Sequence, residues 1–255
     1  MKGSFAKLIL LGFLAVPITT AKAWIPFVLD SGDQQISLLE LYTSEGCSSC
    51  PPAEAWFSTL KNDPGLWEKL VPVSFHVDYW NHLGWPDPYS SEDYTQRQRE
   101  YGAQWRSESI YTPEFVLNGM EAHPMEGNIG MISSDHLPGT LKATLQSDGS
   151  LRVAFLPRKP VTKTLIAEVA LLGNDITGIV PRGENAGRNL HHDFIALALI
   201  RCTLEPAAAS SMEEYKGTLI LPSHLKVPAT ALALWVRSAD SLTPIQAVGG
   251  WMKSA

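Results

Sequence analysis

The chain has 255 residues, is 45% hydrophobic and 18% charged, and carries a formal net charge of −6. These values fit one large or two modest globular domains and argue against intrinsic disorder. A weakly acidic chain without a cluster of lysine and arginine also argues against a nucleic-acid-binding protein.

Residues 1–23 have the pattern of a secretory signal peptide. Lys2 and Lys7 precede an apolar run over 8–18, and Ala21-Lys22-Ala23 matches a small-x-small cleavage site. The apolar run is too short to span a bilayer comfortably, and no other stretch is long and apolar enough to do so. We therefore expect an exported protein, periplasmic or extracellular, with no membrane span after the signal is cleaved.

The segment 24–137 is predicted to alternate strands and helices. Apolar residues over 36–42 predict a strand, and apolar positions 53, 56, 57 and 60 predict the face of a helix. Alternation over 71–77 predicts a second strand, and a capping pattern followed by spaced aromatic residues predicts a helix over 91–106. A short strand is expected over 115–117. Strands that alternate with helices favour an α/β domain whose sheet has parallel members.

From residue 138 to residue 255 the pattern changes to one of period 2. Alternating apolar residues on either side of Ser147-Asp148-Gly149 predict a hairpin. Turn residues separate further strand patterns over 164–172, 175–180, 191–202, 216–221, 230–237 and 243–248. These strands without helices predict a second, mostly antiparallel β domain that resembles a sandwich.

Cys47 and Cys50 form a Cys-x-x-Cys motif between the first predicted strand and the first predicted helix. The positive end of a helix stabilises a thiolate, so we expect Cys47 to be the attacking sulfur and Cys50 to resolve a mixed disulfide. His76 and Asp78 end the second predicted strand and are candidates for an acid or base near Cys47. An alternative is that they cap the loop that follows. Cys202 follows an apolar run and is expected to be a buried single cysteine.

Three interpretations of the cysteine pair stay open. The first is a redox pair that exchanges disulfides with protein thiols. The second is an inert disulfide in a binding module whose β domain engages an envelope partner. The third is a copper chaperone that holds Cu(I) with Cys47 and Cys50, for which His76 is a candidate third ligand. A structural zinc site would need further ligands, and no second Cys-x-x-Cys exists. We expect no cofactor and no resident metal ion.

The strand, the motif Gly46-Cys47-Ser48-Ser49-Cys50-Pro51 and the helix together resemble the thioredoxin-like superfamily. The segment Tyr111–Gly119 resembles the Thr-Pro segment of that superfamily. The resemblance implies a cis peptide bond at Pro113 and places Thr112 and Pro113 against the cysteine pair. It also implies a fold class: an α/β thioredoxin-like domain followed by the mostly antiparallel β domain. The implied function is that of a thiol–disulfide oxidoreductase.

More narrowly, the chain resembles a secreted bacterial family catalogued as domain of unknown function 1223. The matching segments are 40–53, 76–80, 83–85, 87–88, 111–119 and 182–188 with His192. The resemblance spans about 36–250 and implies an exported bacterial protein. It implies no particular substrate.

Overall fold

A computed structural model of the chain describes residues 24–126, 136–207 and 214–253. The expected signal peptide, 1–23, lies outside the described residues. The α-helices are α1 (Cys50–Thr59) and α2 (Glu92–Trp105), with short 3-10 turns at Leu60–Asn62, Asn81–Leu83 and Pro124–Glu126. The strands are β1 (Phe27–Asp30), β2 (Ser37–Thr43), β3 (Leu70–His76), β4 (Glu114–Leu117), β5 (Met120–Ala122), β6 (Gly139–Leu145), β7 (Ser150–Pro157), β8 (Leu165–Gly173), β9 (Ile176–Ile179), β10 (Asn189–His192), β11 (Ile195–Pro206), β12 (Tyr215–Ile220), β13 (Ala231–Ser238) and β14 (Pro244–Trp251).

Twelve of these strands form one mixed sheet. Its main path runs β1-β6-β7-β12-β11-β3-β2-β4-β5, and a branch leads from β11 through β8 and β13 to β14. β2 and β3 are parallel, and β3 pairs in parallel with the start of β11, where Ile195 lies opposite Ser74. β9 and β10 form a separate two-stranded sheet. One long strand, β11, therefore joins the first part of the chain to the second.

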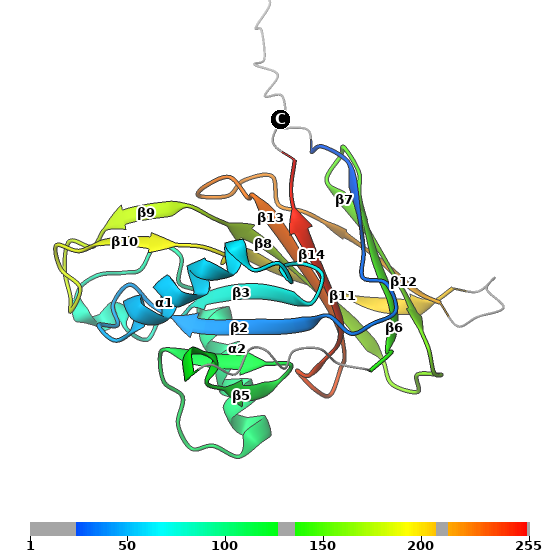
Figure 1. Cartoon of the computed structure of the whole chain (residues 1–255), viewed down its shortest axis with the longest axis horizontal. Helices are drawn as coiled ribbons and strands as arrows, with labels where there is room; N and C mark the ends of the chain where they lie inside the picture. The colour runs from blue at the N-terminus through cyan, green and yellow to red at the C-terminus, as the bar shows by residue number, and fades with distance from the viewer. Residues whose placement is uncertain (1–23, 127–135, 208–213, 254–255) are drawn as a thin grey trace, which may run out of the picture.

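Two strands, β8 and β13, are buried on both faces. Along β13, Ala233 and Trp235 pack into one hydrophobic core, while Leu232 and Leu234 pack into another. β8 alternates between the same two cores. Figure 1 shows the result: α1, β2, β3 and α2 lie on one side of these strands, and β6, β7 and β12 lie on the other. The side chains of a strand alternate between its two faces, so one pair of strands supplies a wall to each core.

The expected fold class is wrong. The described residues form a mostly β protein with two α-helices and one twelve-stranded sheet, and not an α/β thioredoxin-like domain followed by a β domain. The strand–helix pattern between 36 and 117 is present locally. Its strand β3, however, pairs with β11 from the second half of the chain, so the first half does not form a separate sheet. The division into one domain over 24–137 and a second over 138–255 stays a prediction.

Most individual elements agree with the predicted ranges. The strand expected over 191–202 is instead two strands, β10 and β11, with Asp193 and Phe194 between them. Phe194 adopts a left-handed backbone conformation with φ of 56°, which a β-strand cannot continue through. The hydrophobic pattern contains no signal for this break.

Neither α-helix in the described part of the chain is long and apolar enough to cross a membrane.

Candidate functional site

The cysteine pair lies where β2 leads into α1. Cys47 follows the strand, Cys50 is the first residue of the helix, and their sulfurs form a disulfide. Pro51 and Pro52 occupy the first helical turn, where a missing N–H costs little. Both cysteines are fully buried, although Ser48 and Ser49 between them are exposed. Cys202, on β11, is the free cysteine, and it is half-buried rather than fully buried.

The Thr112–Pro113 segment lies beside the cysteine pair. Its peptide bond is cis, as the resemblance implies. The carbonyl oxygen of Thr112 lies 3.7 Å from Cys47 Sγ, and the Thr112 hydroxyl accepts a hydrogen bond of 2.8 Å from the indole N–H of Trp80. The position of Thr112 next to the sulfur is thus an observation, whereas a role for Thr112 or Pro113 in chemistry stays a prediction.

A loop from the second half of the chain covers the motif. This covering loop, residues 181–188, connects β9 to β10. The side-chain amide of Asn185 donates to the carbonyl oxygens of Glu45 (2.9 Å) and Cys47 (2.8 Å). The backbone N–H of Ser48 donates to the carboxylate of Glu184 at 3.1 Å. The resemblance includes residues 182–188 of this loop. The sequence favours a connection between strands there, with binding of a carboxylate or of the other domain by Arg182 and Arg188 as the alternative.

The other two predicted site residues do not contact the sulfurs. His76 Nδ1 is 2.7 Å from a carboxylate oxygen of Asp87, and Asp78 accepts a 2.6 Å hydrogen bond from the hydroxyl of Thr95. Asp78 thereby fixes the start of α2, which agrees with the alternative of a structural role. His76, the candidate third ligand of the Cu(I) interpretation, contacts Asp87, Tyr89 and His192. A Cu(I) site at the cysteine pair itself stays a prediction.

His76 instead belongs to a buried group of five ionisable residues, which we call the His76–His192 cluster. Its members are Glu45, Glu54, His76, Asp87 and His192. They come from five separate segments: the β2–α1 loop, α1, the end of β3, the loop before α2, and the end of β10. The two imidazole rings meet edge to face, with centroids 5.1 Å apart.

Carboxylates surround both imidazoles of this cluster. His192 Nε2 lies 3.2 Å from Glu45, and His192 Nδ1 lies 2.8 Å from Glu54. Burial opposes a charge on His192, but the carboxylates of Glu54 and Glu45 outweigh it and raise the pKa of His192 to about 10. Burial likewise opposes ionisation of Glu54 and Asp87, yet the neighbouring imidazoles keep the pKa of each carboxyl below its ordinary value. The site therefore favours positive charge at its centre.

A second buried group of charges lies under α2. This Arg97 cluster contains Glu40, Arg97, Glu168 and Arg237. Arg97 donates to both oxygens of Glu40 and to Glu168, at 2.8 to 3.0 Å. Glu168 also accepts from Arg237 at 3.1 Å and from the indole of Trp235 at 2.7 Å. The cluster joins α2 to β2, β8 and β13.

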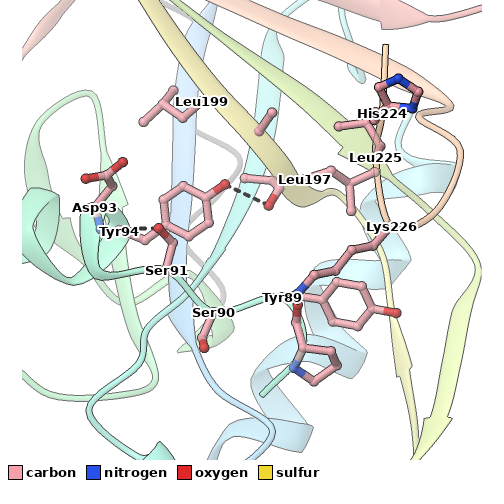
Figure 2. A pocket seen from close by; sticks show the side chains of 13 residues that line it. Tyr89, Ser90, Ser91, Asp93, Tyr94, Leu197, Leu199, His224, Leu225 and Lys226 are labelled. Atoms are coloured by element: carbon pink, nitrogen blue, oxygen red, sulfur yellow. Dashed lines mark hydrogen bonds between the residues drawn. The ribbon is translucent and has the colours of Figure 1, made fainter. Parts of the chain in front are cut away.

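A surface pocket of about 440 Å³ lies between the 88–94 loop, β11 and residues 224–226. In Figure 2, Tyr94 donates a hydrogen bond to the backbone of β11, and Lys226 lies beside Tyr89. The Lys226 ammonium contacts the carbonyl oxygen of Pro88. Tyr89 also packs edge-on against His76, with ring centroids 5.9 Å apart. The pocket is therefore a neighbour of the His76–His192 cluster and not a continuation of the cysteine site.

The sequence reasoning missed four of the five cluster residues, although two of them leave a signal. Glu54 comes four residues after Cys50 and three before Phe57, which places a carboxylate on the buried stripe of α1. His192 lies two residues after the buried Leu190 on β10, so it shares that buried face. Glu45 and Asp87 lie in loops, where no periodicity applies.

Comparisons with known proteins identify a family and a fold. The family model described as "Protein of unknown function (DUF1223)" matches residues 38–237. The crystal structure of protein AGR_C_4864 from Agrobacterium tumefaciens superposes with a TM-score of 0.58 at 20% identity, covering 86% of this chain and 95% of that one. HBP35 of Porphyromonas gingivalis gives 0.61 at 15% identity, covering 88% and 77%. Identities this low show a shared fold alone. No curated protein matches the chain.

Proposed function

The chain belongs to the DUF1223 family, whose description names no activity, and from its cysteine pair we propose an exported protein that exchanges disulfides with protein thiols. The observation that carries this proposal is the Cys47–Cys50 disulfide at the start of α1, with the Thr112 carbonyl next to Cys47 Sγ. A helix N-terminus stabilises a thiolate, which makes each sulfur a good leaving group. An exported location supplies the oxidising surroundings in which such a pair persists.

The disulfide exchange proceeds in two steps. A substrate thiolate attacks Cys47 Sγ, the Cys47–Cys50 bond breaks, and Cys50 leaves as a thiolate. A second thiolate of the substrate then attacks the mixed disulfide and releases Cys47 as a thiolate. Two electrons pass from the substrate dithiol to the cysteine pair, and the substrate leaves with a disulfide. The same steps in reverse reduce a substrate disulfide.

The covering loop controls access in this proposal. Both sulfurs are fully buried, and Asn185 and Glu184 hold the loop on the backbone of the motif. A substrate therefore reaches Cys47 only when residues 181–188 move away. Exposed serines at positions 48 and 49 mark the side from which the substrate approaches.

The same burial favours a second candidate function, a binding module in which the disulfide is structural. In that case the covering loop protects the disulfide permanently, and the pair resists reduction. The two candidates differ in one measurable quantity, which is the reduction potential.

The test is to equilibrate purified mature protein in glutathione buffers and trap the free thiols. A potential between about −270 and −120 mV supports exchange, and a value below about −300 mV supports a structural disulfide. Cys47→Ser should abolish exchange with a model dithiol, whereas Cys202→Ser, the matched control, should leave it unchanged. Asn185→Ala removes two hydrogen bonds from the covering loop and should speed reduction of the pair by about tenfold or more. Unchanged exchange in Cys47→Ser would rule out the proposal.

A further inference from the structure

Two ring nitrogens in the His76–His192 cluster have no hydrogen-bond partner. They are His76 Nε2 and His192 Nδ1, both shielded from solvent. The carboxylate of Glu54 lies 2.8 Å from His192 Nδ1, but outside the direction of a hydrogen bond. His192 Nδ1 thus has an ion-pair partner in Glu54, whereas His76 Nε2 has no partner at all. Buried polar atoms nearly always have a partner, so His76 Nε2 indicates a binding partner of another kind.

Three residues of the cluster bring potential ligand atoms close together. One ligand atom from each of Glu54, His76 and His192 lies within 4.8 Å of the other two. The three residues come from α1, β3 and β10, and each is at least nine-tenths buried. Ligands about 2.0 to 2.2 Å from one ion lie within about 4.4 Å of one another, so small side-chain adjustments bring these three groups around a single metal ion.

The outer nitrogen of each imidazole has a carboxylate partner. Asp87 contacts His76 Nδ1 at 2.7 Å, and Glu45 contacts His192 Nε2 at 3.2 Å. Glu45 is itself held by the indole N–H of Trp85 at 2.6 Å. In metal sites a ligating histidine almost always donates its second ring N–H to a carboxylate, a carbonyl or water, which fixes the tautomer and the ring orientation. Both histidines of the cluster have this arrangement.

We propose that Glu54, His76 and His192 bind a divalent first-row transition metal ion, with Asp87 and Glu45 as the orienting outer shell. Two imidazole nitrogens and one carboxylate form a donor set that suits Zn²⁺ and its neighbours in the series. Three protein ligands leave a coordination position open for water or a small ligand. An imidazole binds a metal ion only in its neutral form, so binding releases the proton from His192. With both imidazoles neutral, the three buried carboxylates carry a charge of −3, which a divalent ion largely offsets.

A second acidic group in the chain shows by contrast why this site is distinctive. Asp175, His191 and Asp193 also lie within mutual reach. There, however, the ammonium of Lys61 is 2.5 Å from Asp175 and 2.9 Å from Asp193. A lysine already supplies the positive charge to that group, and His191 has Asp193 as a partner at 2.9 Å. Unpartnered ring nitrogens are thus not a general property of histidines in this chain.

An ion can reach the site along α1. Glu54 lines a surface pocket of about 380 Å³ between α1 and β10, and it also lines a small internal space with His192. The side chain of Glu54 therefore separates the pocket from the cluster. In this proposal the ion enters from that pocket past the side chain of Glu54.

The proposal does not depend on disulfide exchange. To test it, the full mature protein is stripped with a chelator, dialysed, and titrated with Zn²⁺. We expect one Zn²⁺ per chain. Glu54→Gln and His192→Gln should each weaken binding by about a hundredfold or more, and Glu45→Gln, an outer-shell change, by about 10- to 100-fold. His191→Gln, the neighbouring exposed histidine, is the matched control and should bind Zn²⁺ as tightly as the unaltered protein.

A second measurement begins with the Co²⁺ spectrum of the unaltered chain, whose first result does not depend on whether variants fold. Co²⁺ bound to nitrogen and oxygen ligands should give visible d–d bands without a thiolate charge-transfer band. The Cys47→Ser/Cys50→Ser double variant should give the same spectrum. No Zn²⁺ binding by the stripped protein, or undiminished binding by folded His192→Gln, would overturn the proposal. A thiolate band that disappears in the double variant would assign the metal to the cysteines and would overturn it as well.

Discussion

The Arg97 cluster and the His76–His192 cluster are both buried and both rich in carboxylates, but their cations differ. In the Arg97 cluster the cations are guanidinium groups, which stay charged and offer several N–H donors in a fixed plane. Each of the two glutamates accepts from at least one of them. In the His76–His192 cluster the bases are imidazoles, which can give up a proton and then accept a metal ion.

The donors of the central cation distinguish the two sites: all three side-chain nitrogens of Arg97 donate, although Arg237 Nε at the edge of its cluster has no partner. The contacts of Arg97 bind α2 to three strands, which is what a structural connection requires. The His76–His192 cluster leaves a nitrogen on each ring without a hydrogen bond. A buried charged group is therefore not evidence for a functional site by itself. Unused bonding capacity among potential ligand atoms that lie close together is the better indicator.

The largest expected effect comes from removing the central cation of the Arg97 cluster. Arg97→Met leaves Glu40 and Glu168 buried with too few partners, and should lower the free energy of unfolding by about 3 to 5 kcal/mol. Denaturant unfolding measures this change. Arg99→Met, an exposed position on the same helix, is the control and should change stability little. A loss below about 1 kcal/mol for Arg97→Met would mean that the cluster does not hold the fold together.

Acid should weaken the same cluster. Burial opposes ionisation of Glu168, but Arg97 and Arg237 lower its pKa from 4.5 to about 2. The folded protein thus keeps Glu168 ionised at pH values where the unfolded chain is protonated. Its contribution is fully present above pH 4.5 and is lost as the pH falls through about 2. Glu168→Gln should cost about 3 kcal/mol at neutral pH and flatten the loss of stability below pH 4.5, measured by unfolding at several pH values. An unchanged acid profile would contradict this.

Glu114 extends the comparison to a buried carboxylate without a cation. Burial raises its pKa from 4.5 to about 7, and Glu121 adds to this effect, although the amide of Gln98 donates to it at 2.6 Å. Here the folded state holds the proton more tightly, so stability falls as the pH rises from 4.5 to 7. Glu114→Gln should remove that fall and stabilise the protein by about 1 to 3 kcal/mol at pH 8. Unfolding at pH 5 and pH 8 measures it, and Glu108→Gln, at an exposed position, is the control.

The smallest effect on stability is expected for Glu54→Gln in chelator. The new amide oxygen still accepts from Thr43, whose hydroxyl lies 2.5 Å from Glu54. Glu45 remains beside His192, and an imidazole can lose its proton, so no charge is stranded. We expect a loss of about 1 kcal/mol in denaturant unfolding. A loss as large as that of Arg97→Met would mean that Glu54, like Arg97, mainly holds the fold together.

Local patterns predicted the elements better than the architecture. The helix expected over 91–106 is α2, and the strands around Cys47 lie where the alternation of apolar residues places them. The pairing of β3 with β11 joins Ser74 to Ile195, and no periodic pattern encodes a contact across that distance in the chain. The run of apolar residues in β8 and β13 reflects burial on two faces. An apolar run in the sequence cannot distinguish a strand that lies between two cores from a strand that is buried inside one core.

The site was predictable to a similar extent. Cys47, Cys50 and Thr112 are brought together, as the motif and the Thr-Pro resemblance imply. His76 and Asp78 do not lie at the sulfurs. Their partners are Asp87, in the loop after β3, and Thr95, in the first turns of α2. His192 comes from a hairpin in the second half of the chain. Its meeting with His76 results from the long-range pairing that the sequence does not disclose.

One side chain of β14 links segments that lie far apart in the chain. Gln246, on β14, is fully buried and accepts from the backbone N–H of Ile36 while donating to the carbonyl oxygens of Gln34 and Gly139. A nascent chain therefore lacks these three hydrogen bonds until residue 246 has been synthesised. A chain truncated before β14 should remain unfolded and vulnerable to proteases, however intact its cysteine motif.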